Sequence, residues 1–149
     1  MERPDKIHYY LDIATTVSER STCLRRKYGA VIVKNDEIVS TGYNGAPRNR
    51  ENCIKRNYCI RDTLKVNHNE RCELCRAVHA EQNALLSASR NELLGSTLYL
   101  SCTENDNIVK DAECCNICKK LIINAGIEYV IIRDSKTEQR IYDVKEWNV

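Results

Sequence analysis

Hydrophobic side chains recur at helical spacing in three parts of the chain and at strand-like spacing in four others. The helical pattern covers residues 5–20, 78–90 and 115–125. Short strand-like runs of apolar and β-branched residues cover residues 30–34, 37–43, 97–101 and 129–133. The order of these segments predicts an α-β-β-α-β-α-β protein.

The connections between these segments predict how the strands pair. Asn35-Asp36 is a two-residue turn signal, so we expect the first two strands to form an antiparallel hairpin. The later strands alternate with helices, which favours parallel pairing through right-handed crossovers. We therefore expect a three-layer α/β/α fold with a mixed sheet of about five strands and helices on both faces. The polar segments 48–76 and 103–113 are expected to be loops, and the tail to residue 149 fits either a strand or a loop.

Composition narrows the class of protein. A chain of 149 residues suits one domain, and its 23 basic and 21 acidic side chains give a formal net charge of +2. Such near-neutrality argues against a protein that binds nucleic acid by charge. No apolar run approaches the roughly 18 residues of a membrane span, and residues 1–12 lack a signal-peptide core. These features favour a cytoplasmic location.

The nine cysteines are unusual for such a chain. A reducing compartment disfavours disulfides, so clustered thiols indicate a metal, with zinc as the default. Cys115 and Cys118 open one predicted helix, and His79 opens another. Together they supply three ligands and leave a fourth position open, which is the arrangement of a catalytic zinc. Glu81 follows closely, so its carboxylate can reach a water molecule without binding the metal.

Each of these motifs is weak evidence by itself. An isolated His-Ala-Glu is usually the start of a surface helix, and an isolated C-x-x-C is as often a redox pair or a chance occurrence as half of a metal site. The two motifs in this order, each at the start of a predicted helix, match the H-x-E and C-x-x-C signature of zinc-dependent deaminases.

Four segments strengthen this interpretation: STCLRRKYGAVIVK, STGYNGAP, ELCRAVHAEQNALL and CNICKKLIINAGIEYVII. On these segments the chain resembles the deoxycytidylate (dCMP) deaminases of the cytidine and deoxycytidylate deaminase superfamily. The resemblance implies a cytidine-deaminase-like fold and a single zinc-dependent deaminase domain over residues 1–149. It also implies hydrolytic deamination of dCMP to dUMP and ammonia, which supplies dUMP for thymidylate synthesis.

The resemblance further implies roles for the motif residues. His79, Cys115 and Cys118 are expected to hold the catalytic zinc. Glu81 is expected to carry a proton from water to the cytosine ring and then to the departing amine.

Other positions are expected to contact the substrate. By resemblance, Asn44 holds the deoxyribose, the backbone of Ala30 faces the base edge, and Arg90 takes part in substrate recognition. Three further cations are candidates for the phosphate on charge and position alone, with a solvated surface cation as the equal alternative: Arg26, Lys27 and Arg48.

The chain departs from the family pattern at two places. Cys114 stands where the family usually has a proline, so two adjacent thiols compete for the first thiol-ligand position. We assign Cys115, because it keeps the C-x-x-C spacing to Cys118. The loop over residues 102–113 is also longer than is usual in the superfamily, and we expect it to reshape the pocket or to join a subunit contact.

Residues 48–76 are expected to form a Cys-rich insertion that binds a second, structural zinc. In phage relatives with a second zinc, the position that matches Cys23 also takes part, so five thiols compete for four places. The expected ligands are Cys53, Cys59, Cys72 and Cys75, with Cys23 as the substitute. His68 is a weaker option, and free thiols in a reduced loop are the alternative.

Two other functions stay open at this point. The same chemistry suits another cytosine-containing substrate, including a base in a single strand, although the low net charge and the lack of phenylalanine argue against a nucleic acid. A zinc-binding interaction module without activity leaves Glu81 without a role. From the family we expect a homo-oligomer, commonly a hexamer, with dCTP and dTTP as candidate allosteric effectors.

Overall fold

The computed structural model describes residues 2–67 and 74–149. A six-stranded sheet has the order β2-β1-β3-β5-β6, and β4 pairs with β3. The strands are β1 (Lys27–Lys34), β2 (Glu37–Tyr43), β3 (Thr97–Glu104), β4 (Asn107–Ile108), β5 (Tyr129–Arg133) and β6 (Gln139–Asp143). The helices are α1 (Lys6–Ser18), α2 (Cys53–Arg56), α3 (Ile60–Thr63), α4 (Ala80–Leu86), α5 (Arg90–Leu93) and α6 (Asn116–Ala125), followed by the 3-10 turn η2 (Val144–Glu146).

The strand directions confirm the mixed sheet expected from the sequence. β1 and β2 form the predicted antiparallel hairpin, and β1 is also antiparallel to β3. β3 and β5 are parallel and are connected through α6, as the alternation of strands and helices predicted. β6 is antiparallel to β5 and closes the far edge.

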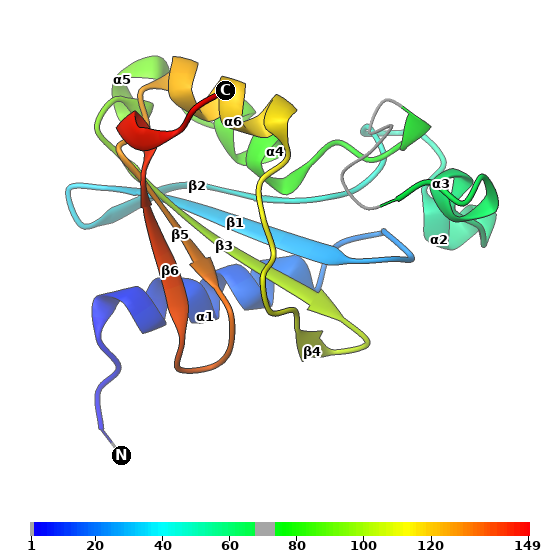
Figure 1. Ribbon diagram of the computed structural model, residues 1–149, viewed down its shortest axis with the longest axis horizontal. Coiled ribbons are helices and arrows are strands. Elements are labelled where there is room, and N and C mark those ends of the chain that lie inside the picture. Colours follow the sequence, from blue (N-terminus) through cyan, green and yellow to red (C-terminus); the bar gives the residue numbers. More distant parts are fainter. Residues whose placement is uncertain (1, 68–73) are drawn as a thin grey trace.

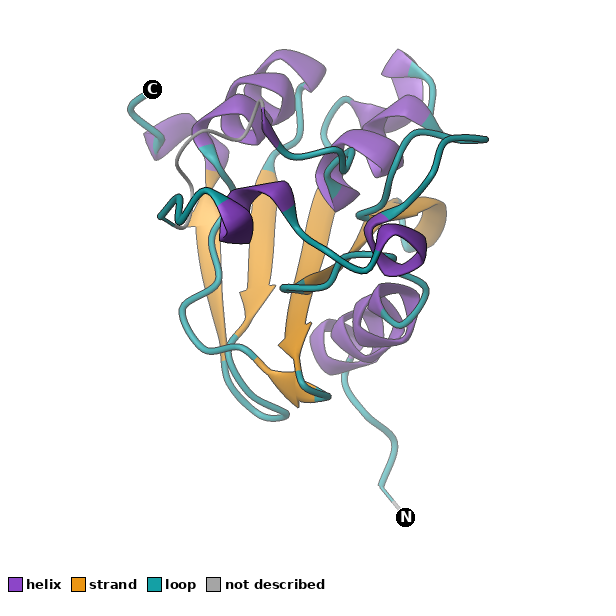
Figure 2. Ribbon diagram, turned by 90° about the vertical axis from the view of Figure 1, so that its right-hand side faces the viewer, coloured by secondary structure: helices purple, strands orange, loops and turns teal. Residues whose placement is uncertain are grey.

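Helices cover both faces of the sheet, and each face has its own apolar core (Figures 1 and 2). In the interior strand β1, Val31 and Val33 pack toward α1, whereas Ala30 and Ile32 pack toward α4 and α6. This alternation follows from the two-residue repeat of a strand. Both faces of β1 are therefore buried, which explains its nearly continuous apolar sequence.

Helix ends follow local chemical signals. The Asp5 side chain caps α1 by accepting a hydrogen bond from the backbone N–H of His8 at 2.8 Å. Gly126 ends α6 in the left-handed region, with φ of 83°, a conformation that glycine adopts readily. No helix in the described ranges is long and apolar enough to cross a membrane.

The helix predicted over residues 78–90 is instead two helices, α4 and α5. Ser89 starts the second one with a reciprocal cap. Its hydroxyl accepts from the backbone N–H of Glu92, and the Glu92 carboxylate accepts from the backbone N–H of Ser89. This capping box favours a new helix over continuation of α4.

The segments expected to be loops carry short elements. Residues 103–113 contain the end of β3 and the strand β4, joined at Asn105-Asp106. These two residues have φ of 51° and 64°, the same values as Asn35-Asp36, so the same turn chemistry occurs twice. The Cys-rich segment contains α2 and α3, and the ambiguous tail forms β6 and η2.

Strand direction also decides where the functional loops meet. β2 and β3 are both antiparallel to β1, so they run in the same direction. Their C-terminal ends therefore lie at the same edge of the sheet, beside the N-terminal end of β1. α4 follows β2 along the chain, and α6 follows β3. The N-termini of both helices, together with the start of β1, therefore lie at this edge, where ligands bind in open α/β sheets.

Candidate metal centre and substrate cavity

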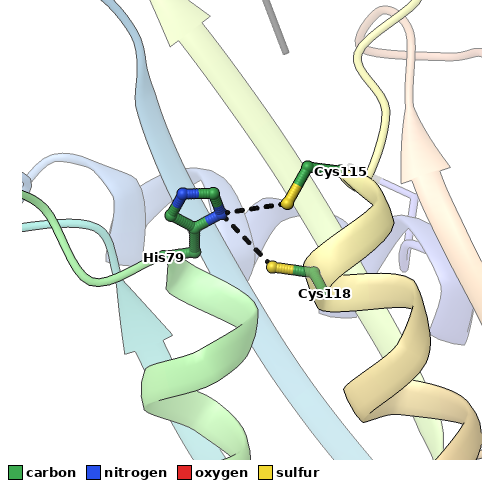
Figure 3. A group of neighbouring side chains, drawn as sticks. All are labelled: His79, Cys115 and Cys118. Carbon is green, nitrogen blue, oxygen red and sulfur yellow. Dashed lines mark hydrogen bonds between the residues drawn. The ribbon is translucent and has the colours of Figure 1, made fainter. Parts of the chain in front are cut away.

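Two helix N-termini carry the residues singled out by the sequence. His79 is the N-cap of α4, and its backbone N–H donates to Oε1 of Gln82 at 2.8 Å. Cys115 is the N-cap of α6, and Cys118 lies in the first turn of that helix. Figure 3 shows the three side chains pointing toward one another from the two helices.

Their donor atoms are spaced as a zinc site requires. Nδ1 of His79 lies 3.4 Å from Sγ of Cys115 and 3.3 Å from Sγ of Cys118. A tetrahedral zinc with ordinary bond lengths sets nitrogen and sulfur ligands about 3.6 Å apart. Within residues 2–67 and 74–149, these three are the His, Cys, Asp or Glu residues whose ligand atoms all lie within 4.8 Å of one another. The residues fit zinc and leave one coordination position for another ligand.

The two thiols differ in protonation when no metal is bound. A hydrogen bond from the Cys118 thiol lowers the pKa of Cys115 to about 3, against the effect of burial and with help from His79. The same hydrogen bond, together with burial, raises the pKa of Cys118. The two opposite shifts thus have one cause, the hydrogen bond between the two sulfur atoms. Metal binding has to displace the proton of that hydrogen bond, because zinc binds the deprotonated sulfur.

Glu81 is a buried carboxyl group beside the three donors. Only 3% of the residue is exposed, and burial raises its pKa. Its carboxylate accepts a hydrogen bond from the thiol of Cys114, which is also buried. A carboxyl group in such surroundings holds a proton more readily than one in water, as a proton shuttle must.

The adjacent thiols Cys114 and Cys115 have different surroundings. Cys115 faces His79 and Cys118, whereas Cys114 faces Glu81. The assignment of Cys115 from the C-x-x-C spacing therefore agrees with the positions of the side chains. The eight cysteines that the structure describes form no disulfide.

His79, Glu81 and Cys115 line one cavity, and Asn44 lines it too. The Asn44 amide joins two segments of backbone: Oδ1 accepts from the N–H of Tyr28 at 2.8 Å, and Nδ2 donates to the carbonyl of Arg26 at 2.9 Å. Asn44 therefore fixes the start of β1 beside the cavity. Its role toward a sugar stays a prediction.

The other expected substrate contacts are placed differently. Arg26 lines the cavity, but Lys27 and Arg48 do not. Ala30 is buried in the middle of β1, paired with both neighbouring strands. Arg90 is at the start of α5, where it donates to the carbonyl of Asn124 and lines a separate groove. The structure thus does not bring Ala30 or Arg90 to this cavity.

The Cys-rich insertion reaches the same cavity. The thiol-bearing residues that line it are Cys23, Cys53, Cys59 and Cys75. Burial, and then the neighbouring thiols, raise the pKa of Cys53, which is consistent with their proximity. The expected ligand Cys72 and the weaker option His68 lie outside the described residues.

Two arginines that the sequence analysis did not single out also line the cavity. Arg25 precedes β1, and Arg61 is in α3. Arg25 directly neighbours the named candidate Arg26, yet charge alone did not distinguish it. Arg61 had no distinguishing signal, because its position depends on how the insertion folds.

Comparison with known proteins supports the metal centre. Residues 4–133 match the cytidine and deoxycytidylate deaminase zinc-binding region. The chain belongs to the cytidine and deoxycytidylate deaminase family. The matched region includes the starts of α4 and α6, where His79, Cys115 and Cys118 lie together.

Several members of this family are similar over most of the chain. The deoxycytidylate deaminase of Mycobacterium phage D29 is 40% identical over 136 residues, covering 88% of this chain and 96% of that protein. The deoxycytidylate deaminase of Saccharomyces cerevisiae is 35% identical over 133 residues, covering 89% of this chain, which spans only 39% of the yeast protein.

The fold has a close counterpart among solved structures. The dCMP deaminase of cyanophage S-TIM5, in complex with dCMP and dUMP, superposes with a TM-score of 0.61 at 29% identity. The match covers 91% of this chain and 85% of the cyanophage chain. The cytidine-deaminase-like fold expected from the sequence is confirmed.

Proposed function

We propose that the chain catalyses the hydrolytic deamination of dCMP to dUMP and ammonia. The observation that carries the proposal is the convergence of His79, Cys115 and Cys118 at one edge of the sheet, beside the buried carboxyl group of Glu81. The substrate class is supported by the relatives, since the phage D29 protein is a deoxycytidylate deaminase and the S-TIM5 enzyme binds dCMP and dUMP.

The chain's own residues account for the proton transfers. Zinc held by His79, Cys115 and Cys118 supplies Lewis acidity, which makes water a nucleophile near neutral pH. The Glu81 carboxylate accepts a proton from the water that attacks C4 and delivers a proton to N3 of the cytosine. A further transfer to the 4-amino nitrogen lets ammonia leave, so that dCMP and water give dUMP and ammonia.

Ammonia release from dCMP, CMP, deoxycytidine and cytosine tests this function with zinc-replete protein. We expect turnover of dCMP, and we expect Glu81→Gln to lower kcat by at least about 100-fold while zinc remains bound. The matched control is Glu128→Gln, which neutralises an exposed carboxylate remote from the cavity. Wild-type protein that leaves dCMP unchanged would refute the substrate. Full activity of Glu81→Gln would refute the mechanism.

We further propose that the insertion holds a second zinc. Four thiols support this, since Cys23, Cys53, Cys59 and Cys75 line one cavity and two of them, Cys53 and Cys59, are buried. Their sulfur atoms are more widely spaced than those of the first site, so the metal would draw them together. Zinc analysis of Cys53→Ser against Cys115→Ser tests the proposal. Each variant should lose a different ion, and wild-type protein with a single zinc would contradict it.

We also propose that the chain self-associates. Large apolar side chains on the outer helices support this, because Leu86, Ile117 and Leu121 are 80%, 47% and 42% exposed. Sedimentation equilibrium should give a mass above that of one chain, and it should fall in a Leu86→Lys variant. The hexamer, regulation by dCTP and dTTP, the single-domain boundaries and the cytoplasmic location stay predictions.

A further inference from the structure

The cavity that contains the candidate metal centre also contains a group of positive charges. Arg25 and Arg26 enter it from the segment before β1, and Arg61 enters it from α3 of the insertion. Among the described residues, the carboxylates that line it are Glu81 and Glu113. Glu113 is paired outside the cavity, because it accepts hydrogen bonds from Arg140 and from the Tyr142 hydroxyl. Three guanidinium groups thus face two carboxylates in the described part of this cavity.

Arg61 is an unusual feature of a short surface helix. Only 9% of the residue is exposed, and an arginine is rarely buried this far unless it takes part in specific interactions. Its Nη2 donates to the carbonyl of Asn67 at 2.8 Å, which fixes the direction of the guanidinium plane.

Arg25 is held beside Arg61 by the same helix. Its Nε lies 2.9 Å from the carboxylate of Asp62, the residue after Arg61. The Nη1 atom of Arg25 is buried and has no hydrogen-bond partner within the described ranges. A buried donor without an acceptor is unfavourable, because it has lost its hydrogen bonds to water. An anion in the cavity would supply that acceptor.

Arg26 has different partners from these two. Its guanidinium lies 3.7 Å from the carboxylate of Glu104 and is hydrogen-bonded to Tyr28. Part of its charge is therefore balanced at the β3 end of the cavity. Arg25 and Arg61 are the pair whose position depends on the insertion.

The chemistry of the pair indicates the class of ligand. Two arginines that line one cavity offer several N–H donors to a tetrahedral dianion, which phosphate monoesters provide. The candidate metal ligand His79 and the proposed proton carrier Glu81 line the same cavity. We propose that Arg25 and Arg61 bind the 5′-phosphate of the nucleotide, and that Arg61 makes the cavity select a nucleotide over the corresponding nucleoside.

This inference rests on the proposed function for the identity of the base. It also gives the insertion a role in binding the phosphate of the substrate. Arg61 is two residues after Cys59, the buried N-cap of α3. A metal bound by the insertion thiols would thus hold a substrate-binding arginine in place as well as stabilising a loop.

Calorimetric binding of dUMP and 2′-deoxyuridine to the zinc-replete full chain tests the proposal without requiring turnover. We expect Arg61→Ala to weaken dUMP binding by on the order of 10- to 100-fold and to leave deoxyuridine binding unchanged. Arg25→Ala should act in the same direction, and Arg61→Lys should restore part of the loss. The matched control is Arg56→Ala, which removes another arginine of the insertion that stacks on Tyr58 and does not line the cavity.

The outcomes separate the two proposals. Equal weakening of both ligands by Arg61→Ala, with Arg61→Lys no better, would mean that Arg61 only supports the insertion, and this would overturn the inference. Unchanged dUMP binding in both alanine variants, or wild-type protein that binds neither ligand, would also overturn it. Protein that binds dUMP through Arg61 but releases no ammonia from dCMP would refute the reaction and leave the phosphate site established.

Discussion

Helix α4 packs closely against the sheet at Gly42 in β2, and this contact bears on the position of the metal centre. A Cβ atom on Gly42 would lie 3.0 Å from the carbonyl carbon of Asn83 and closer still to the backbone of Ala80 and Ala84. All three residues belong to α4, the helix that begins at His79 and carries Glu81. We therefore predict that Gly42→Ala impairs catalysis although residue 42 contacts no substrate.

The magnitude follows from contact distances and from the rigidity of α4. Carbon atoms in unstrained contact are about 3.5 Å or more apart, so α4 has to move outward by roughly 1 Å. His79 and Glu81 move with it, whereas Cys115 and Cys118 stay on α6. A misplacement of about 1 Å costs on the order of 100-fold in rate, and the overpacking costs about 1–3 kcal/mol of stability.

Gly29→Ala is the matched control. A Cβ on Gly29 in β1 would lie 2.5 Å from the backbone nitrogen of Ser18 and closer to the carbonyl of Ala14, so it overpacks α1 on the opposite face of the sheet. α1 carries none of the candidate site residues. Urea unfolding should show a loss of stability in both variants, but kcat/KM for dCMP should fall mainly in Gly42→Ala. If the two variants lose activity in proportion to stability alone, the proposed link between β2 and the metal centre is wrong.

Three further predictions concern stability. Ile132→Ala empties a fully buried position in β5 and should lower the free energy of unfolding by about 2–5 kcal/mol, whereas Ile141→Ala on the exposed side of β6 should change it little. Asn44→Ala removes two hydrogen bonds to the backbone before and within β1 and should cost about 1–3 kcal/mol in urea unfolding. Burial acts to raise the pKa of Asp134, but the hydrogen bonds from Arg140 and from the Asp111 backbone, together with nearby positive charge, outweigh it and lower the pKa. Stability from Asp134 is therefore present above its unfolded-state pKa and lost as pH falls through the folded one. Acid titration of unfolding should show the gap between wild type and Asp134→Asn closing below about pH 4, and a constant gap would contradict this.

Some features of this protein were determined by the sequence itself. The H-x-E and C-x-x-C motifs could be located because each lies at a helix start, where a few neighbouring residues decide the local conformation. The apolar run of β1 and the Asn35-Asp36 turn were equally local signals. The turn at Asn105-Asp106 carried the same signal, but the strand after it has only two residues and too little pattern to be identified.

Other features were decided by the tertiary structure alone. β6 is an edge strand with only β5 beside it, so its partly buried residues need no strong apolar alternation and its sequence was ambiguous. Arg25 and Arg61 join the cavity because β1 starts at the edge where α4 and α6 begin, and because α3 folds against that start through Asp62. Hydrophobic periodicity indicates which face of a helix or strand is buried, but it does not indicate which distant loops lie side by side. The order and direction of the strands determine which loops meet, and these result from packing across the whole sheet.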